Sequence, residues 1–177
     1  MESLGDFRES KYSEKQRKLE RALQEVEKLV DKVGIPIDEG IKETVAILQV
    51  MGFQTSSSCS GHRSSEEGIA PPYIEIYAPA PSGWEKNKQK QEEWEITNNK
   101  QRERINALLE EFNRTSQAIT EAQLYLRNIG GYGGFRIQSK NAEKPPATVD
   151  EKFKIIEAFQ KEMAAFTAFI KERYFRE

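Results

Sequence analysis

Hydrophobic residues in the first part of the chain follow the repeat of an α-helix. Over residues 14–33 they recur every three or four positions, which predicts one amphipathic helix. Ser13 is a typical N-cap, and Gly34 followed by Pro36 is a typical helix end. The apolar stripe consists of Leu19, Ala22, Leu23, Val26, Leu29, Val30 and Val33.

A second helix is predicted to begin at Asp38, which is a good N-cap residue, and to end at Gly52. After Gly52 the pattern changes. Phe53, Gln54 and Thr55 suit a strand, and the small polar residues that follow suit a turn. We therefore expect a short strand that runs into a serine-rich turn, Ser56 to His62. The buried side of the second helix would hold Ile41, Val45, Leu48 and Met51.

Alternation of apolar and polar residues predicts three further strands. In residues 73–77, which follow two prolines, Ile74 and Ile76 point one way and their neighbours the other. Residues 124–127 and 135–138 flank a glycine-rich segment, so we expect them to form a hairpin with a loose or bulged turn.

The remaining segments divide into one ambiguous stretch and two helices. Residues 85–101 are strongly polar, and they are either a solvated helix or an ordered linker. A third helix is expected from about Thr97 to Asn113, on the stripe Ile105, Leu108, Leu109 and Phe112. A final helix is expected over residues 149–174, with Phe153, Ile156, Met163, Phe166 and Ile170 on its apolar side.

Grouping of the strands in pairs predicts an α+β fold, because a doubly wound parallel sheet alternates strands with helices. We expect one domain over residues 1–177, with the N-terminal helix 14–33, an α+β core 38–140 and the C-terminal helix 149–174. The sheet should have four mainly antiparallel strands, with helices packed on one face. The long terminal helices should extend beyond the sheet and pair with each other or with a second copy of the chain.

Composition narrows the function classes. The 27 basic and 29 acidic residues nearly cancel, which argues against a globally basic nucleic-acid binder and leaves open a local basic patch. No apolar run is long enough for a membrane span and the first twenty residues carry mixed charge, so we expect no membrane association and a cytoplasmic protein. One cysteine and one histidine exclude an internal disulfide and a zinc site built from these residue types alone.

The serine-rich turn is the best candidate for a site. Residues 55–63 combine hydroxyls, a thiol, an imidazole and a guanidinium around Gly61. Tight turns expose backbone N–H groups and hydroxyl donors, from which anion and phosphate sites are built. A plainer interpretation is that the serines satisfy the turn's own backbone.

Cys59 and His62 have a C-x-x-H spacing, which suits half of a metal site or a thiolate with its base. A structural zinc site would need carboxylates such as Glu66, Glu67 or Glu75 to complete four ligands. We favour no metal here, with Cys59 packed under the turn and His62 either bonded to its loop or titrating near neutral pH. The sequence does not identify a cofactor.

Arg136 and Gln138 share one face of the predicted hairpin, and Arg127 on the neighbouring strand is a further candidate for this face. If the two strand pairs adjoin, this face meets the serine turn and forms a pocket suited to phosphate or carboxylate. The alternative is a solvated sheet face. The predicted ligand-binding residues are Ser57, Ser58, Cys59, Ser60, Gly61, His62, Arg63, Glu75 and Arg136.

Two resemblances start from the same turn. The segment from Ile37 to His62 resembles the SSCSG region of the tRNA wybutosine-synthesis methyltransferase family, which implies S-adenosylmethionine and a tRNA guanosine as substrates. Residues 38–140 resemble a group of uncharacterised small bacterial and phage proteins with an SC-x-GH turn, a later PY-hydrophobic strand and an FR-hydrophobic strand. His62 stands where the methyltransferases usually have arginine.

Three functions follow, in order of preference. The first is a module that binds a small anionic or phosphorylated ligand, such as a nucleotide, at the serine-rich turn. The second is a structural or interaction protein that dimerises through its terminal helices. The third is an S-adenosylmethionine-dependent RNA-modifying enzyme.

Overall fold

The structure is a computed structural model that describes residues 4–30, 34–64, 68–144 and 148–177. Within them lie the helices α1 (Leu4–Lys28), α2 (Glu39–Val50), α3 (Lys88–Thr115) and α4 (Val149–Arg176), and the short 3-10 helix η1 (Trp84–Lys86). The strands are β1 (Thr55–Cys59), β2 (His62–Ser64), β3 (Gly68–Ala70), β4 (Tyr73–Ile76), β5 (Leu124–Asn128) and β6 (Phe135–Ser139). Among the described residues, no helix has the length and apolarity needed to cross a membrane.

Four strands form one antiparallel sheet in the order β1-β4-β6-β5. The predicted α+β class and antiparallel four-stranded sheet are therefore confirmed. Beyond a kink, the β1–β4 pair continues as the small β2–β3 sheet, with His62 opposite Ala70. The kink lies at Ser60 and Gly61, across from the two prolines that precede β4.

One face of the sheet carries the helices, as predicted. On this face Ile74, Ile76, Phe135 and Ile137 are fully buried. A single hydrophobic cluster joins them to residues of all four helices, among them Leu19, Ile41, Ile105 and Phe166. The alternation predicted for β4 and β6 produces this face, because every second side chain of a strand points the same way.

The opposite face carries Tyr73, Glu75 and Arg136 side by side on β4 and β6. The Arg136 guanidinium forms an ion pair with Glu75 through Nη2 as well as a 3.1 Å hydrogen bond from Nε to Oε1. It also stacks over the Tyr73 ring, 3.9 Å from the centroid. The charge of Arg136 and two of its three guanidinium nitrogens are therefore engaged within the sheet.

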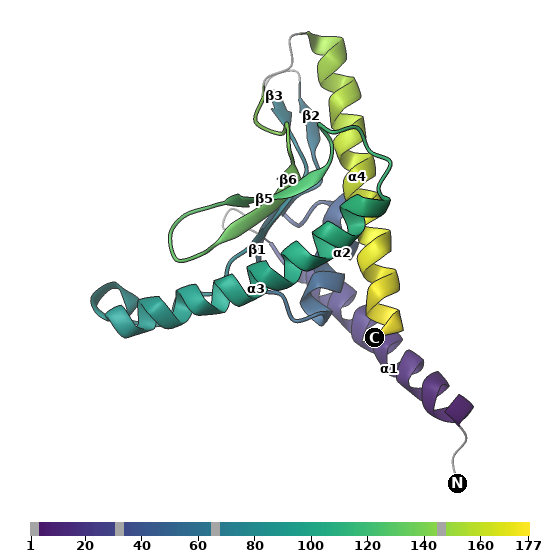
Figure 1. Ribbon diagram of the computed structural model, residues 1–177, viewed down its shortest axis with the longest axis vertical. Coiled ribbons are helices and arrows are strands. Elements are labelled where there is room, and N and C mark those ends of the chain that lie inside the picture. Colours follow the sequence, from purple (N-terminus) through teal and green to yellow (C-terminus); the bar gives the residue numbers. More distant parts are fainter. Residues whose placement is uncertain (1–3, 31–33, 65–67, 145–147) are drawn as a thin grey trace.

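The long terminal helices were predicted correctly, and they contact each other within one chain (Figure 1). Lys15 Nζ donates to the carbonyl of Tyr174 at 2.8 Å, and the Tyr174 hydroxyl donates to the carbonyl of Lys15 at 3.2 Å. The rings of Tyr12 and Phe175 lie 4.9 Å apart. Pairing with a second copy of the chain stays a prediction.

The predicted boundaries of two helices are wrong. α1 spans Leu4–Lys28 rather than 14–33, so Ser13 lies inside it, and the described residues Leu29 and Val30 follow it as exposed side chains. Val33, the last residue of the predicted stripe, lies outside the described residues. The prediction placed the start too late because the first turns of the helix are mostly polar and lack a continuous apolar stripe.

α3 begins at Lys88, well before the predicted Thr97, so the ambiguous polar segment is mostly helix. The Asn87 side chain caps it by accepting from the Lys90 N–H at 3.1 Å. Its polar half is anchored by hydrogen bonds: Trp94 Nε1 donates to the carbonyl of Ala78 at 2.7 Å. The period of apolar residues could not reveal this kind of anchoring.

The serine-rich segment is largely strand rather than turn. Residues 55–59 form β1 at the edge of the sheet, and the turn is reduced to Ser60 and Gly61. Small polar side chains suit this edge position because the strand is partly solvated, with Ser56 and Ser57 exposed. The predicted hydroxyl cluster therefore lies along a strand edge.

Candidate functional site

A pocket of about 500 Å³ lies beside β1, within the range typical of small-ligand sites. Ser57, Ser58, Cys59 and His62 line it, together with Tyr73 from β4. Because β1 is an edge strand, one side of its backbone has no neighbouring strand in the sheet. Hydroxyls and backbone groups therefore provide one wall of the pocket.

The facing wall is apolar and comes from the segment after α1. Leu29, Val30 and Ile35 line the pocket, and each is exposed by 44% or more. Val30 forms an isolated antiparallel bridge with Pro36, which folds this segment back on itself. The pocket thus combines a polar side with an apolar rim, a composition suited to a ligand that has both a polar head and an apolar body.

Asp38 is the charged residue that sequence reasoning missed as part of the site. It occupies the N-cap position of α2 but makes no side-chain capping hydrogen bond there. Its Oδ2 instead accepts a hydrogen bond from the backbone N–H of Ser60 at 2.9 Å and lies 3.1 Å from His62 Nε2. Linear spacing gives no signal for this contact, which joins residues more than twenty positions apart.

The kink that carries these groups is fixed from several sides. Gly61 has φ +88°, and a Cβ there would lie 3.0 Å from Pro72 Cδ. Gly40, in the first turn of α2, comes close to Ser60, where an added Cβ would be 3.2 Å from the serine Cβ. From α4, Gln160 Nε2 donates to the carbonyl of Gly61 at 3.1 Å. Three separate elements therefore set the geometry of the residues on either side of the kink.

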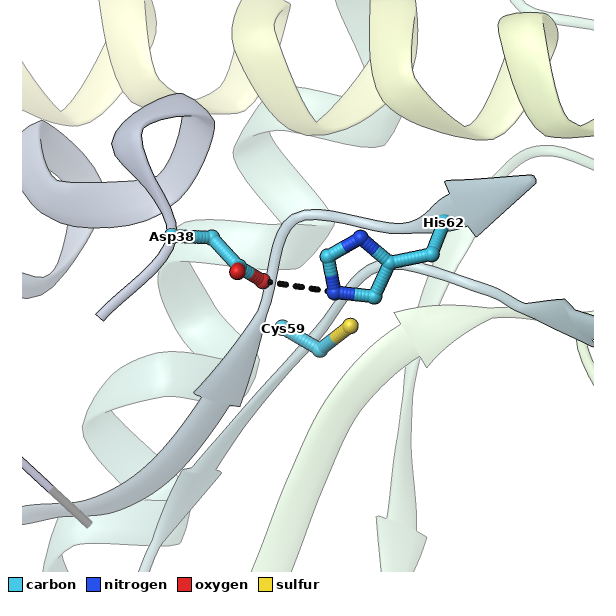
Figure 2. Close-up of side chains that lie close together, drawn as sticks. All are labelled: Asp38, Cys59 and His62. Atoms are coloured by element: carbon cyan, nitrogen blue, oxygen red, sulfur yellow. Dashed lines mark ion pairs between the residues drawn. The ribbon is translucent and has the colours of Figure 1, made fainter. Parts of the chain in front are cut away.

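Asp38, Cys59 and His62 converge at the pocket (Figure 2). One potential ligand atom from each lies within 4.8 Å of the other two. Cys59 is buried, whereas the His62 side chain is 54% exposed. The group therefore joins the protein interior to the solvent-accessible pocket, and among the described residues it is the cluster that could hold a metal ion. Glu66 and Glu67, considered above as further ligands, lie outside the described residues.

The thiol of Cys59 is poorly suited to nucleophilic catalysis. Burial raises its pKa, the Gly61 N–H lowers it by donating to Sγ at 3.4 Å, and the nearby Asp38 carboxylate raises it further. Nucleophilic cysteines need a lowered pKa so that the thiolate is populated near neutral pH. The alternative of a thiolate with His62 as its base is therefore disfavoured in the protein without a bound cation.

The structure brings some of the predicted site residues together and separates others. Ser57, Ser58, Cys59 and His62 line the pocket, and Ser60 and Gly61 form the kink at its edge. Glu75 and Arg136 lie on the open sheet face, paired with each other and not among the residues that line the pocket. The pocket lined by the serines therefore does not include Arg136, whose guanidinium Glu75 and Tyr73 engage. The side chain of Arg63 is outside the described part of the chain.

Comparisons with protein-family models, curated proteins and solved structures give no match. The resemblance of the turn to the wybutosine-synthesis methyltransferases, and that of residues 38–140 to small bacterial and phage proteins, stay predictions.

Proposed function

We propose that this chain binds a small organic ligand with an anionic or phosphorylated head in the pocket beside β1. The observation that carries the proposal is the convergence of Ser57, Ser58, Cys59 and His62 with Asp38 on one pocket of ligand size. The hydroxyls and the exposed imidazole are hydrogen-bond donors for oxygen atoms of such a head. The apolar rim provides contact area for the rest of the molecule.

The carboxylate of Asp38 determines where the head can lie. It would repel an anion, but two donors, the Ser60 N–H and His62 Nε2, already contact its Oδ2. A bound anion is therefore expected on the side of Ser57 and Tyr73, whose hydroxyls are 3.2 Å apart. Arg136 has no direct part in this arrangement.

A thermal-shift panel followed by isothermal titration calorimetry tests the proposal. The panel contains inorganic phosphate, nucleoside monophosphates, sugar phosphates, aliphatic carboxylates and S-adenosylmethionine. A ligand at one hundred times its Kd adds about 2.7 kcal/mol to the free energy of unfolding. For a domain of this size that is a rise in Tm of about 5–10 °C.

Variants then locate the binding site. His62→Gln and Ser57→Ala should each weaken binding about tenfold, the effect expected when one hydrogen bond is lost. Glu39→Gln is the control, because Glu39 is a neighbouring exposed carboxylate outside the pocket lining. A panel without any ligand, or binding that both pocket variants leave unchanged, would contradict the proposal.

Dimerisation through the terminal helices is the second candidate. It is favoured by the exposed ring of Tyr12, which contacts Phe175 where the C-terminal end of α4 packs against α1. Light scattering over a hundredfold range of protein concentration distinguishes the two candidates, since a binding module needs no change in mass. Saturable binding of S-adenosylmethionine in the panel would instead favour the methyltransferase alternative.

A further inference from the structure

We infer that Asp38, Cys59 and His62 form a three-ligand site for a thiophilic divalent cation such as Zn²⁺, with a fourth position open to the pocket. The inference rests on the proposed function in taking this pocket as the ligand site. It goes further by naming a cation at its polar end. The cation would supply the positive charge that an anionic head needs and that Arg136 does not provide.

The donor set is the first argument. A carboxylate oxygen, an imidazole nitrogen and a thiolate sulfur are the three kinds of atom that bind Zn²⁺ in proteins, and a thiolate disfavours Mg²⁺ and Ca²⁺. Sites with three protein ligands and one exchangeable position are the pattern of zinc centres that act on bound molecules. Asp38, Cys59 and His62 all line the pocket, so the fourth position faces the space where a ligand would lie.

The distances are the second argument. With metal–ligand bonds of about 2.0–2.3 Å, donor atoms around a tetrahedral ion are roughly 3.3–3.7 Å apart. Asp38 Oδ2 and His62 Nε2 are already 3.1 Å apart, and all three donor atoms lie within 4.8 Å of one another. Movement of about 1 Å closes the site, and the exposed His62 side chain is free enough to supply it.

The surrounding hydrogen bonds are the third argument. The Ser60 N–H donates to Asp38 Oδ2 at 2.9 Å, and the Gly61 N–H donates to Cys59 Sγ at 3.4 Å. Outer-shell donors of this kind orient ligands and stabilise their negative charge. Both come from the kink that Gln160 and Gly40 hold in place, so the ligands are positioned before an ion binds.

Charge balance is consistent with an anionic fourth ligand. Binding of the ion replaces the thiol proton, which passes to solvent, so the thiolate and the Asp38 carboxylate together neutralise the 2+ charge. The neutral centre can then accept one further anionic or neutral oxygen donor from the pocket. In the cation-loaded protein a carboxylate or phosphate head is therefore bound by the ion, whereas in the cation-free protein it lies on the side of Ser57 and Tyr73, away from the Asp38 carboxylate.

Titration with Co²⁺ tests the inference on the full chain, kept reduced and freed of metal with EDTA. Because the chain has one cysteine and one histidine, spectroscopic signals of thiolate and imidazole ligation belong to Cys59 and His62 without ambiguity. We expect one Co²⁺ per chain, visible d–d bands of tetrahedral intensity and a near-ultraviolet thiolate-to-cobalt charge-transfer band. Zn²⁺ should displace the Co²⁺ and abolish all of these bands.

Three variants and one control assign the ligands. Cys59→Ser should abolish the charge-transfer band. His62→Gln and Asp38→Asn should each weaken Co²⁺ binding more than about 100-fold, since outer-shell changes alone cost about 10–100-fold. Glu39→Gln, one position from Asp38, should leave the affinity unchanged. His62→Gln is decisive because the residue is exposed and its replacement leaves the fold intact, which circular dichroism verifies for every variant.

Several results would overturn the inference: no stoichiometric Co²⁺ binding to the wild-type chain, a charge-transfer band that survives Cys59→Ser, or an affinity that His62→Gln does not change. The ligand panel, repeated on EDTA-treated protein with and without added Co²⁺, separates this inference from the proposed function. Ligand binding that is equal under both conditions, without Co²⁺ binding at the cluster, overturns the cation site and preserves the ligand pocket. Co²⁺ binding at the cluster, with no ligand bound under either condition, preserves the cation site and overturns the proposed ligand binding.

Discussion

Gly61 holds the kink that joins β1 to β2, and its replacement by alanine should destabilise the protein strongly. The residue has φ +88°, where a side chain is strained, and an alanine Cβ would lie 3.0 Å from Pro72 Cδ and 3.3 Å from the carbonyl oxygen of Ala70. Ala70 ends β3 and Pro72 directly precedes β4, and the contacting atoms belong to the backbone or to the proline ring. The clash therefore cannot be relieved by rotating a flexible side chain.

Two other glycines separate the cost of the left-handed backbone from the cost of the steric clash. Gly34 has a similar φ of +85°, but an added Cβ there would have no neighbour within 4 Å. Gly131 has the same open space, and its φ is outside the left-handed region. Left-handed backbone costs an ordinary residue about 1–2 kcal/mol, and overpacking adds about 1–3 kcal/mol. We expect Gly131→Ala to be nearly neutral, Gly34→Ala to cost about 1 kcal/mol and Gly61→Ala to cost about 2–4 kcal/mol.

Thermal and urea unfolding of the three variants measure these differences. For a domain of this size, Tm falls by about 2–4 °C per kcal/mol, so Gly61→Ala should melt about 4–16 °C below the wild type. If Gly61→Ala is no less stable than Gly34→Ala, the close contact with Pro72 is not a feature of the folded protein. The folded fraction of Gly61→Ala should also show weaker Co²⁺ binding, since Cys59 and His62 flank the residue.

Two further predictions concern buried polar groups away from the pocket. Burial raises the pKa of Glu162 above its usual 4.5, although the Ser116 hydroxyl opposes this by donating to its carboxylate at 2.7 Å. The protonated carboxyl therefore stabilises the fold fully below pH 4.5, and this stabilisation is lost as the pH rises through the folded-state pKa. Glu162→Gln should raise the free energy of unfolding by on the order of 1 kcal/mol over wild type at pH 7 and change it little at pH 4. An equal effect at both pH values in urea unfolding would refute this. Asn98→Ala should cost about 2–3 kcal/mol, because the buried amide accepts from the Ala78 N–H at 2.8 Å and donates to the Tyr132 carbonyl at 2.9 Å. Chemical denaturation measures that cost, and a loss below about 0.5 kcal/mol would show that water replaces both bonds.

The sequence was sufficient for the strands of the core and for the last helix. Alternation at Ile74 and Ile76 predicted β4 and its buried face, and the helical stripe that includes Phe166 and Ile170 predicted α4. These elements bury apolar side chains at regular spacing, and burial of this kind is what a periodic pattern reports. Their pairing into one antiparallel sheet followed from the grouping of strands.

Prediction was less successful where polar contacts determine the structure. The first half of α3 depends on the hydrogen bonds of Asn98 and Trp94, which have no periodic signature. Arg136 was predicted to face a ligand, yet Glu75, opposite it on β4, forms an ion pair with it. Cross-strand partners depend on the register, and the register could not be read from either strand separately.

The wrong prediction at the end of α1 bears directly on the site. Leu29 and Val30 continue the helical stripe in sequence, but the helix stops before them and leaves them exposed at the rim of the pocket. Asp38 likewise has the position of a helix cap but directs its carboxylate to Ser60 and His62. In both cases a residue that fits the local pattern lies instead at the pocket. Exposed apolar side chains and an unused cap both lower the stability of the unliganded fold, and functional sites are where such departures concentrate. A ligand that covers Leu29 and Val30, together with an ion that engages Asp38, would remove both costs, which is why the site is placed here and not at Arg136, which Glu75 and Tyr73 already engage.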